Sequence, residues 1–132
     1  MAPMFENLFD HTSIPLLNQV SAFTQARHRL ILSNIANAET PGYRAQDLPE
    51  AAFNQKLREA VAAQARGADG ALAQRLDLDP KPSGGPPGPD GNTVNLETEM
   101  IGLIQNTLRH NTALELMRKQ FALIETAIRE RV

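Results

Sequence analysis

The sequence of 132 residues contains no cysteine and no tryptophan, and aromatic residues make up only 5% of it. Without cysteine the chain has no disulfide framework, no thiol nucleophile and no cysteine-based zinc site. So few aromatic rings leave little surface on which nucleic-acid bases can stack. The 13 basic and 15 acidic residues give a net charge of −2. This charge excludes strongly basic nucleic-acid binders, because contacts to phosphates need clustered lysine and arginine.

Long apolar runs and catalytic motifs are absent as well. No stretch approaches the roughly 20 consecutive apolar residues that span a bilayer, and the first residues lack the basic and apolar segments of a cleavable signal peptide. These rules alone indicate a cytosolic protein, although a dedicated export route that reads another signal escapes the test. The histidines His11, His28 and His110 lack the spacing of a zinc-binding helix. We therefore expect no metal, no cofactor, no small-molecule substrate and no catalytic residue.

The C-terminal third shows the clearest pattern. Ten positions are separated alternately by four and three residues, and eight of them are apolar: Leu96, Met100, Leu103, Thr107, His110, Leu114, Met117, Phe121, Ile124 and Ile128. A heptad pattern of this length predicts a coiled-coil helix. We call these ten positions the heptad seam. Asn95 is the expected N-cap of this helix. At roughly 50 Å the helix is long for a small domain, so we expect it to pack lengthwise on a partner.

Two further helices and one strand are predicted upstream. An amphipathic stripe predicts a helix from about Ser13 to Ala38, ended by a Pro41-Gly42 turn with positive φ at Gly42. A shorter helix is predicted over Leu48 to Arg66, with Asp47 as its N-cap. The alternation in Leu76–Asp79 predicts a short strand.

The segment from Pro80 to Gly91 holds five of the nine prolines and four of the eight glycines, which indicates an exposed loop. We expect a mainly α fold in which the long terminal helices pack as a coiled-coil hairpin, with one short helix and an irregular Pro/Gly-rich central loop. Residues 1–43, 44–91 and 92–132 are expected to form one structural unit. A single hairpin leaves part of its apolar stripes exposed, and this predicts self-assembly or docking among similar subunits.

A polar stretch ends the N-terminal helix. Asn34 and Asn37 lie three residues apart and are followed by Thr40, Gly42 and the only tyrosine, Tyr43. Two interpretations stand. The amides satisfy free carbonyls at the helix end or cap the turn, or they make specific contacts with a neighbouring chain and fix its register. Composition alone does not choose between them.

This stretch also carries a resemblance. The core Asn-Ile-Ala-Asn at 34–37, followed by Thr-Pro-Gly-Tyr at 40–43, resembles the signature of the bacterial flagellar axial proteins, the family of rod, hook and hook-associated proteins. Leu8-Phe9 and the run from Asp90 to Met100 are similar to the proximal rod members of this family. The resemblance covers about residues 5–60 and 90–130, with no match in the middle of the chain.

The resemblance implies a structural subunit of the flagellar rod, located in the periplasm, exported unfolded by the flagellar type III apparatus and needed for motility. Its terminal helices would form the inner coiled-coil layer of a hollow helical assembly. The implied partners are further copies of the chain, FlgC and other rod subunits, FliE, and the membrane-ring and export-gate proteins. The residues expected at the assembly interface are Asn34, Ile35, Asn37, Thr40, Gly42, Tyr43, Leu103, Leu114, Met117, Phe121, Ile124 and Ile128.

Two other functional classes stay open beside this one. A coiled-coil adaptor or regulator would also present an amphipathic helix, but it would form a defined dimer rather than a polymer. An enzyme would need a catalytic constellation that the residues do not show.

Overall fold

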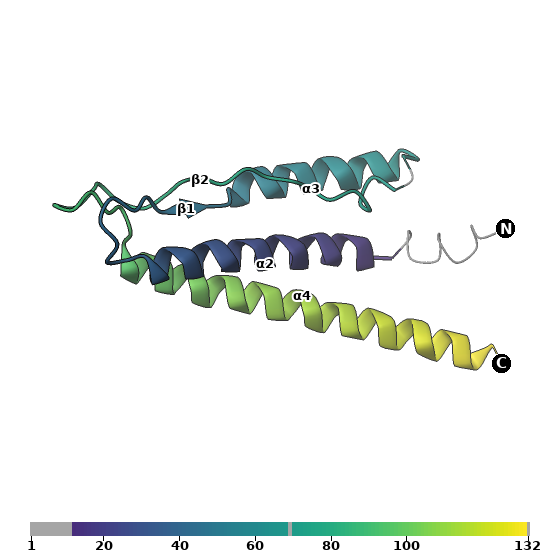
Figure 1. Ribbon diagram of the computed structural model, residues 1–132. Helices are drawn as coiled ribbons and strands as arrows, with labels where there is room; N and C mark the ends of the chain where they lie inside the picture. Colours follow the sequence, from purple (N-terminus) through teal and green to yellow (C-terminus); the bar gives the residue numbers. More distant parts are fainter. Residues whose placement is uncertain (1–11, 69, 132) are drawn as a thin grey trace.

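The computed structural model describes residues 12–68 and 70–131. Leu8, Phe9 and His11 lie outside them. The elements follow in the order α2 (Ile14–Ala36), β1 (Gln46–Asp47), α3 (Glu50–Ala65), β2 (Lys81–Pro82) and α4 (Leu96–Glu130). The expected mainly α fold is confirmed, with α2 lying between α3 and α4 (Figure 1). Within the described ranges, no helix combines the length and the hydrophobicity that a membrane crossing needs.

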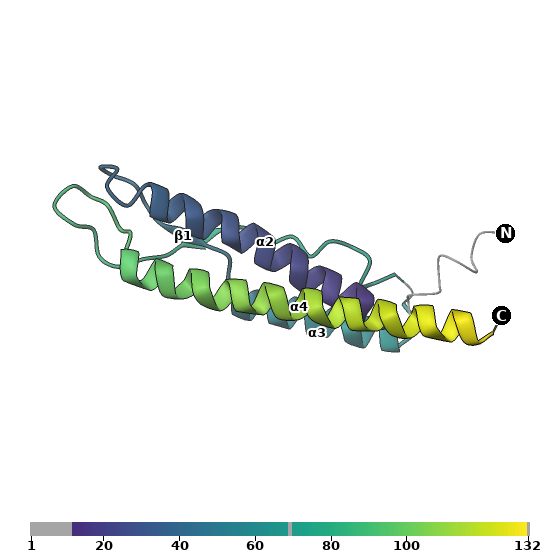
Figure 2. The ribbon, with the colours of Figure 1, turned by 90° about the horizontal axis from the view of Figure 1, so that it is seen from below.

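The long helices α2 and α4 run side by side in opposite directions (Figures 1 and 2). α4 begins at the expected N-cap, because the side chain of Asn95 accepts a hydrogen bond from the N–H of Thr98 at 3.2 Å. α2 ends at Ala36, two residues before its expected end, and Gly42 in the predicted turn has a φ of +74°. Positive φ is costly for residues with a Cβ, so Gly42 is the residue that lets the chain turn here.

The helix pair meets along a line that the heptad seam did not predict. The buried residues of α4 are Glu99, Asn106 and Ala113, each seven residues apart. Asn106 Nδ2 donates to the carbonyl oxygen of Thr24 at 2.8 Å, and His110 Nδ1 lies 2.8 Å from Thr24 Oγ1. These side chains are small or hydrogen-bonded to α2, so the two backbones approach there.

The apolar seam runs beside this contact line. Its members are half-buried at Leu103, His110, Leu114, Met117 and Ile124, and exposed at Leu96, Met100, Thr107, Phe121 and Ile128. Burial of the seam inside a coiled coil therefore stays a prediction.

The N-cap predicted for α3 is wrong. Pro49 occupies the N-cap position and no side chain caps the helix. The carboxylate of Asp47 instead accepts two hydrogen bonds from Arg27, with Nε–Oδ1 and Nη2–Oδ2 distances of 2.9 Å. A bidentate ion pair of this kind is stronger than a single cap bond. The hydrogen bond to Asp47 raises the pKa of the Arg27 guanidinium, against the opposing effect of burial.

The predicted strand at Leu76–Asp79 is also wrong. The strand lies just beyond it, where β2 pairs antiparallel with β1 through Gln46↔Pro82 and Asp47↔Lys81. Residues 72–78 instead run along α2, which offers no ladder of hydrogen bonds. The side chain of Gln19 serves this backbone, because its Nε2 donates to the carbonyls of Leu72 and Gln74, both at 2.8 Å.

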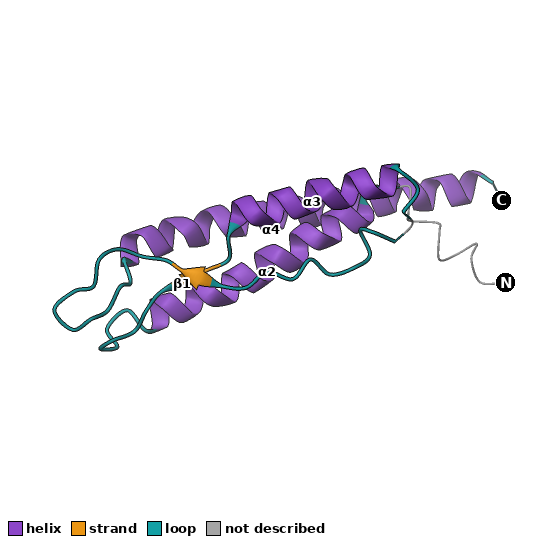
Figure 3. Cartoon of the chain, turned by 90° about the horizontal axis from the view of Figure 1, so that it is seen from above, coloured by secondary structure: helices purple, strands orange, loops and turns teal. Residues whose placement is uncertain are grey.

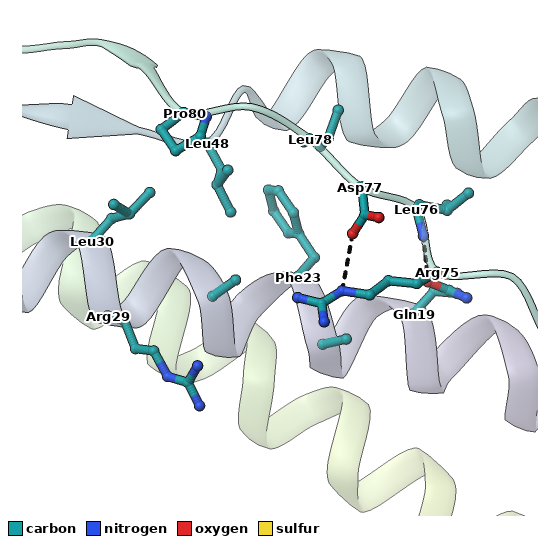
Figure 4. Close-up of a pocket in the computed structure, with 12 residues that line it drawn as sticks. Gln19, Phe23, Arg29, Leu30, Leu48, Arg75, Leu76, Asp77, Leu78 and Pro80 are labelled. Atoms are coloured by element: carbon teal, nitrogen blue, oxygen red, sulfur yellow. Dashed lines mark hydrogen bonds and ion pairs between the residues drawn. The ribbon is translucent and has the colours of Figure 1, made fainter.

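The core is a small cluster around two stacked rings. The centroids of Phe23 and Phe53 lie 4.1 Å apart, with 8° between the ring planes. Leu48 is buried with them, and Leu76 and Leu78 pack against the cluster. A cavity of about 310 Å³ remains between α2 and the 75–80 segment, with the Arg75–Asp77 ion pair at its edge (Figure 4). The apolar contacts that hold α3 are thus one aromatic pair and a few leucines.

Replacement of Phe53 by Ala should lower the free energy of unfolding by about 3–5 kcal/mol, because it removes a fully buried ring and its stacking contact with Phe23. Urea unfolding of the purified chain measures this change. Val61, which is 40% exposed on the same helix, provides the control, and Val61→Ala should stay within about 0.5 kcal/mol of wild type. Equal losses in the two variants would contradict the assignment of the core.

Candidate assembly site at the end of α2

The loop that follows α2 meets the loop that precedes α4 at one end of the molecule (Figure 3). The N–H of Gly42 donates to the carbonyl of Asp90 at 2.8 Å, and the N–H of Thr93 donates to the carbonyl of Tyr43 at 3.0 Å. Gly91 sits so close that a Cβ on it would lie 3.5 Å from the Cα of Gly42. The two stretches that carried the family resemblance therefore form a single site.

Asn92 joins this site to the end of α2. Its Nδ2 lies 2.9, 3.0 and 2.8 Å from the carbonyl oxygens of Asn37, Ala38 and Thr40, and its Oδ1 accepts from the N–H of Val94 at 2.7 Å. Carbonyls at a helix C-cap and in the turn beyond it have no partner within the helix, so the buried amide supplies donors to the turn that follows α2. Sequence reasoning assigned Asn92 no role, although the residue stood inside the Asp90–Met100 run that resembled the rod proteins.

Asn34 is fully buried within the chain. Its Nδ2 donates to the carbonyl of Gln46 at 2.8 Å and to Glu99 Oε2 at 3.1 Å. Its Oδ1 accepts from the hydroxyl of Tyr43 at 3.1 Å and from the N–H of Gln46 at 3.2 Å. Both donors and both acceptor positions of the amide are used. Asn34 therefore connects α2 to β1, to the turn and to α4.

Asn37 is half-buried and bonds locally. Its Nδ2 donates to the carbonyl of Ser33 at 2.8 Å, and its Oδ1 accepts from Thr40 Oγ1 at 3.1 Å. These contacts agree with the interpretation in which the amide satisfies the helix end. A role for Asn37 between subunits stays a prediction.

The predicted interface residues fall into two groups. Asn34, Asn37, Thr40, Gly42 and Tyr43 come together in this site, with Ile35 half-buried on the last turn of α2. The second group lies along α4 and consists of Leu103, Leu114, Met117, Phe121, Ile124 and Ile128. All of these except Leu103 are far along the helix from the site. In the described part of the chain, no three His, Asp or Glu side chains gather to hold a metal. The arrangement is one of amides and backbone groups, which suits it to holding segments in place.

Replacement of Asn92 by Ala should lower the free energy of unfolding by about 1–3 kcal/mol, because it removes the amide contacts to the carbonyls of Asn37, Ala38 and Thr40 and leaves the N–H of Val94 without its partner. Thermal or urea unfolding measures the loss. Asn111 is exposed on α4, and Asn111→Ala should stay within about 0.5 kcal/mol of wild type. An Asn92→Ala protein as stable as wild type would show that the amide does not hold the end of α2.

No family model matches the sequence. Among curated proteins, the chain is 36% identical over 118 residues to the flagellar basal body rod protein FlgB of Cereibacter sphaeroides, covering 84% of this chain and 89% of that protein. It is 33% identical over 110 residues to the protein of the same name in Aeromonas hydrophila, covering 73% and 76%. The match to the FlgB of Salmonella typhimurium is 27% over 105 residues. This likeness spans most of both chains, and the chain therefore belongs to the FlgB family of flagellar basal body rod proteins.

Proposed function

We propose that this chain is a structural subunit of the proximal rod of the flagellar basal body and that it assembles through α2 and α4. The observation that carries the proposal is the extent of the likeness to FlgB, at 36% identity over 84% of the chain. The relatives are named as rod proteins, so the chemistry of an enzyme has no support from them. No particular observation favours a dimeric adaptor.

The exposed part of the heptad seam supports the assembly. Met100, Phe121 and Ile128 are 53%, 47% and 56% exposed. A row of large apolar side chains at heptad spacing is costly to leave in water, and such surfaces mark sites of protein interaction. Packing of this seam against neighbouring subunits would complete the coiled-coil layer. Heterologous, head-to-tail contacts, in which two different surfaces of the chain pair, generate an open helical array of this kind.

The partners and the export route belong to the same proposal. FlgC and further rod subunits would lie beside this chain, with FliE and the membrane-ring and export-gate proteins below. Export of the unfolded chain through the flagellar type III apparatus would deliver it to an oxidising compartment, with which the absence of cysteine agrees.

Deletion of the gene should abolish swimming, and the wild-type gene supplied in trans should restore it. In the same strain, Asn37→Leu should keep the helix content of the purified protein but impair motility, because the variant loses a polar contact expected at the subunit interface. Circular dichroism and a soft-agar motility assay measure the pair. A deletion strain that still swims would overturn the rod function. An Asn37→Leu strain that swims normally would remove only the interface role of Asn37.

The heptad seam makes a second prediction in the complemented strain. Phe121→Ala should reduce motility strongly, because burial of a phenylalanine in an assembly contributes about 3–5 kcal/mol. Leu123 is 64% exposed and lies off the seam, so Leu123→Ala should have the smaller effect. Comparison of the two swarm diameters tests which face of α4 lies at the subunit interface. Loss of motility in Leu123→Ala with normal swimming in Phe121→Ala would place the interface on another face of α4.

A further inference from the structure

Glu99 is a buried carboxylate without a cation. It lies in the first turns of α4 and is 8% exposed. Its one side-chain hydrogen bond in the described chain is from the neutral amide of Asn34, at 3.1 Å, and it forms no ion pair there. The other acids close to α2 differ, since Asp47 and Glu50 pair with Arg27 and Arg109. Buried carboxylates in proteins are normally paired. The partial positive charge of a helix N-terminus, which Glu99 shares with Glu97, is only about half an elementary charge.

A pocket of about 190 Å³ opens beside this carboxylate, between α2, α4 and residues 83–84 of the central loop. Its charged lining residues are Arg27, Asp47 and Glu99. Arg27 and Asp47 neutralise each other through their bidentate contact, which leaves the charge of Glu99 uncompensated. Ser83 also lines the pocket, and its buried hydroxyl has no hydrogen-bond partner in the described chain. The pocket therefore offers one net negative charge.

Gly102 indicates that the pocket is kept open. This glycine lies inside α4, where glycine is less favourable than alanine because it loses more backbone freedom on folding. A Cβ at this position would meet only the Cδ1 atom of Ile31 at 3.8 Å, which is an ordinary contact. Packing of the two helices thus does not require glycine here. Gly102 lines the pocket, and any side chain on it would take up pocket space.

We propose that the Glu99 pocket receives a lysine or arginine side chain from a second copy of this chain. The inference rests on the proposed assembly into a rod and names one of its contacts. A basic head group would form charge-assisted hydrogen bonds with the carboxylate. The chain offers exposed cations for this purpose, among them Arg44, Lys81 and Lys119, for which no side-chain partner occurs in the described residues. A divalent metal ion fits less well, because one uncompensated carboxylate supplies few of the six or more oxygen ligands that calcium takes.

Self-association of the purified full chain tests the proposal. Sedimentation velocity over a range of protein and salt concentrations, together with thermal unfolding, compares wild type with Glu99→Gln, Gly102→Ala and the control Glu97→Gln. Glu99→Gln keeps an acceptor for Asn34 and removes only the charge. We expect it to weaken association by about tenfold or more, the effect of losing a charge-assisted bond, and to reduce the salt dependence. Its melting temperature should stay equal or rise, because a buried unpaired charge is removed.

The other two variants separate docking from folding. Gly102→Ala should raise the melting temperature through its higher helix propensity and still weaken association by narrowing the pocket. Glu97 is exposed on the same turn, and Glu97→Gln should match wild type in association. Loss of stability in Glu99→Gln would overturn the proposal, because the charge would then serve the chain's own fold.

Three further outcomes would overturn the proposal. These are unchanged association of Glu99→Gln, a wild-type chain that stays monomeric throughout, and association that EDTA abolishes. The rod function stands apart from these outcomes. If Glu99→Gln restores full swimming to a non-motile deletion strain, the contact is wrong and the rod function remains.

Discussion

The amide of Asn34 is the contact on which the arrangement of the molecule depends. It is completely buried, and its four hydrogen bonds reach β1, Tyr43 and Glu99. A buried amide left with an unused donor or acceptor is expensive. Any displacement of β1 or α4 along α2 would leave Asn34 unpaired, so one alignment of the three segments is favoured over its neighbours. Asn92 acts similarly just beyond the end of α2, where its amide contacts the carbonyls of Asn37, Ala38 and Thr40.

The polar contact line between α2 and α4 has a consequence for the outer surface. The helices meet at Glu99, Asn106 and Ala113 of α4, so little of the apolar surface of α4 is buried within the subunit. Large apolar residues of the heptad seam therefore remain half-buried or exposed along α4. An apolar stripe that the subunit itself leaves partly in water is the surface that the proposed assembly would bury. Membership of the FlgB family places the chain in the flagellar basal body rod.

Hydrogen bonds and ion pairs, more than apolar burial, attach the central segment to the helix pair. The bidentate pair of Arg27 with Asp47 anchors the start of α3, and Arg109 reaches Glu50 from α4. Gln19 holds the backbone of residues 72–76. The apolar contribution is concentrated in the stacked pair of Phe23 and Phe53. The segment thus has a defined position with a small core, as expected of a subunit whose main apolar surface faces outward.

Local chemistry in the sequence was enough to predict the helices, the Asn95 cap and the Gly42 turn, because periodicity, capping and positive φ depend on near neighbours in the chain. The motif at 34–43 was enough to indicate the axial protein family. Tertiary structure alone decided the rest. Asp47 pairs with Arg27 instead of capping α3. The strand β2 forms beyond the predicted one, where it pairs with β1. The same holds for the face of α4 that meets α2. Apolar spacing predicts which residues of α4 avoid water. The face of α4 that meets α2 is instead determined by the hydrogen bonds of Asn106 and His110 to Thr24.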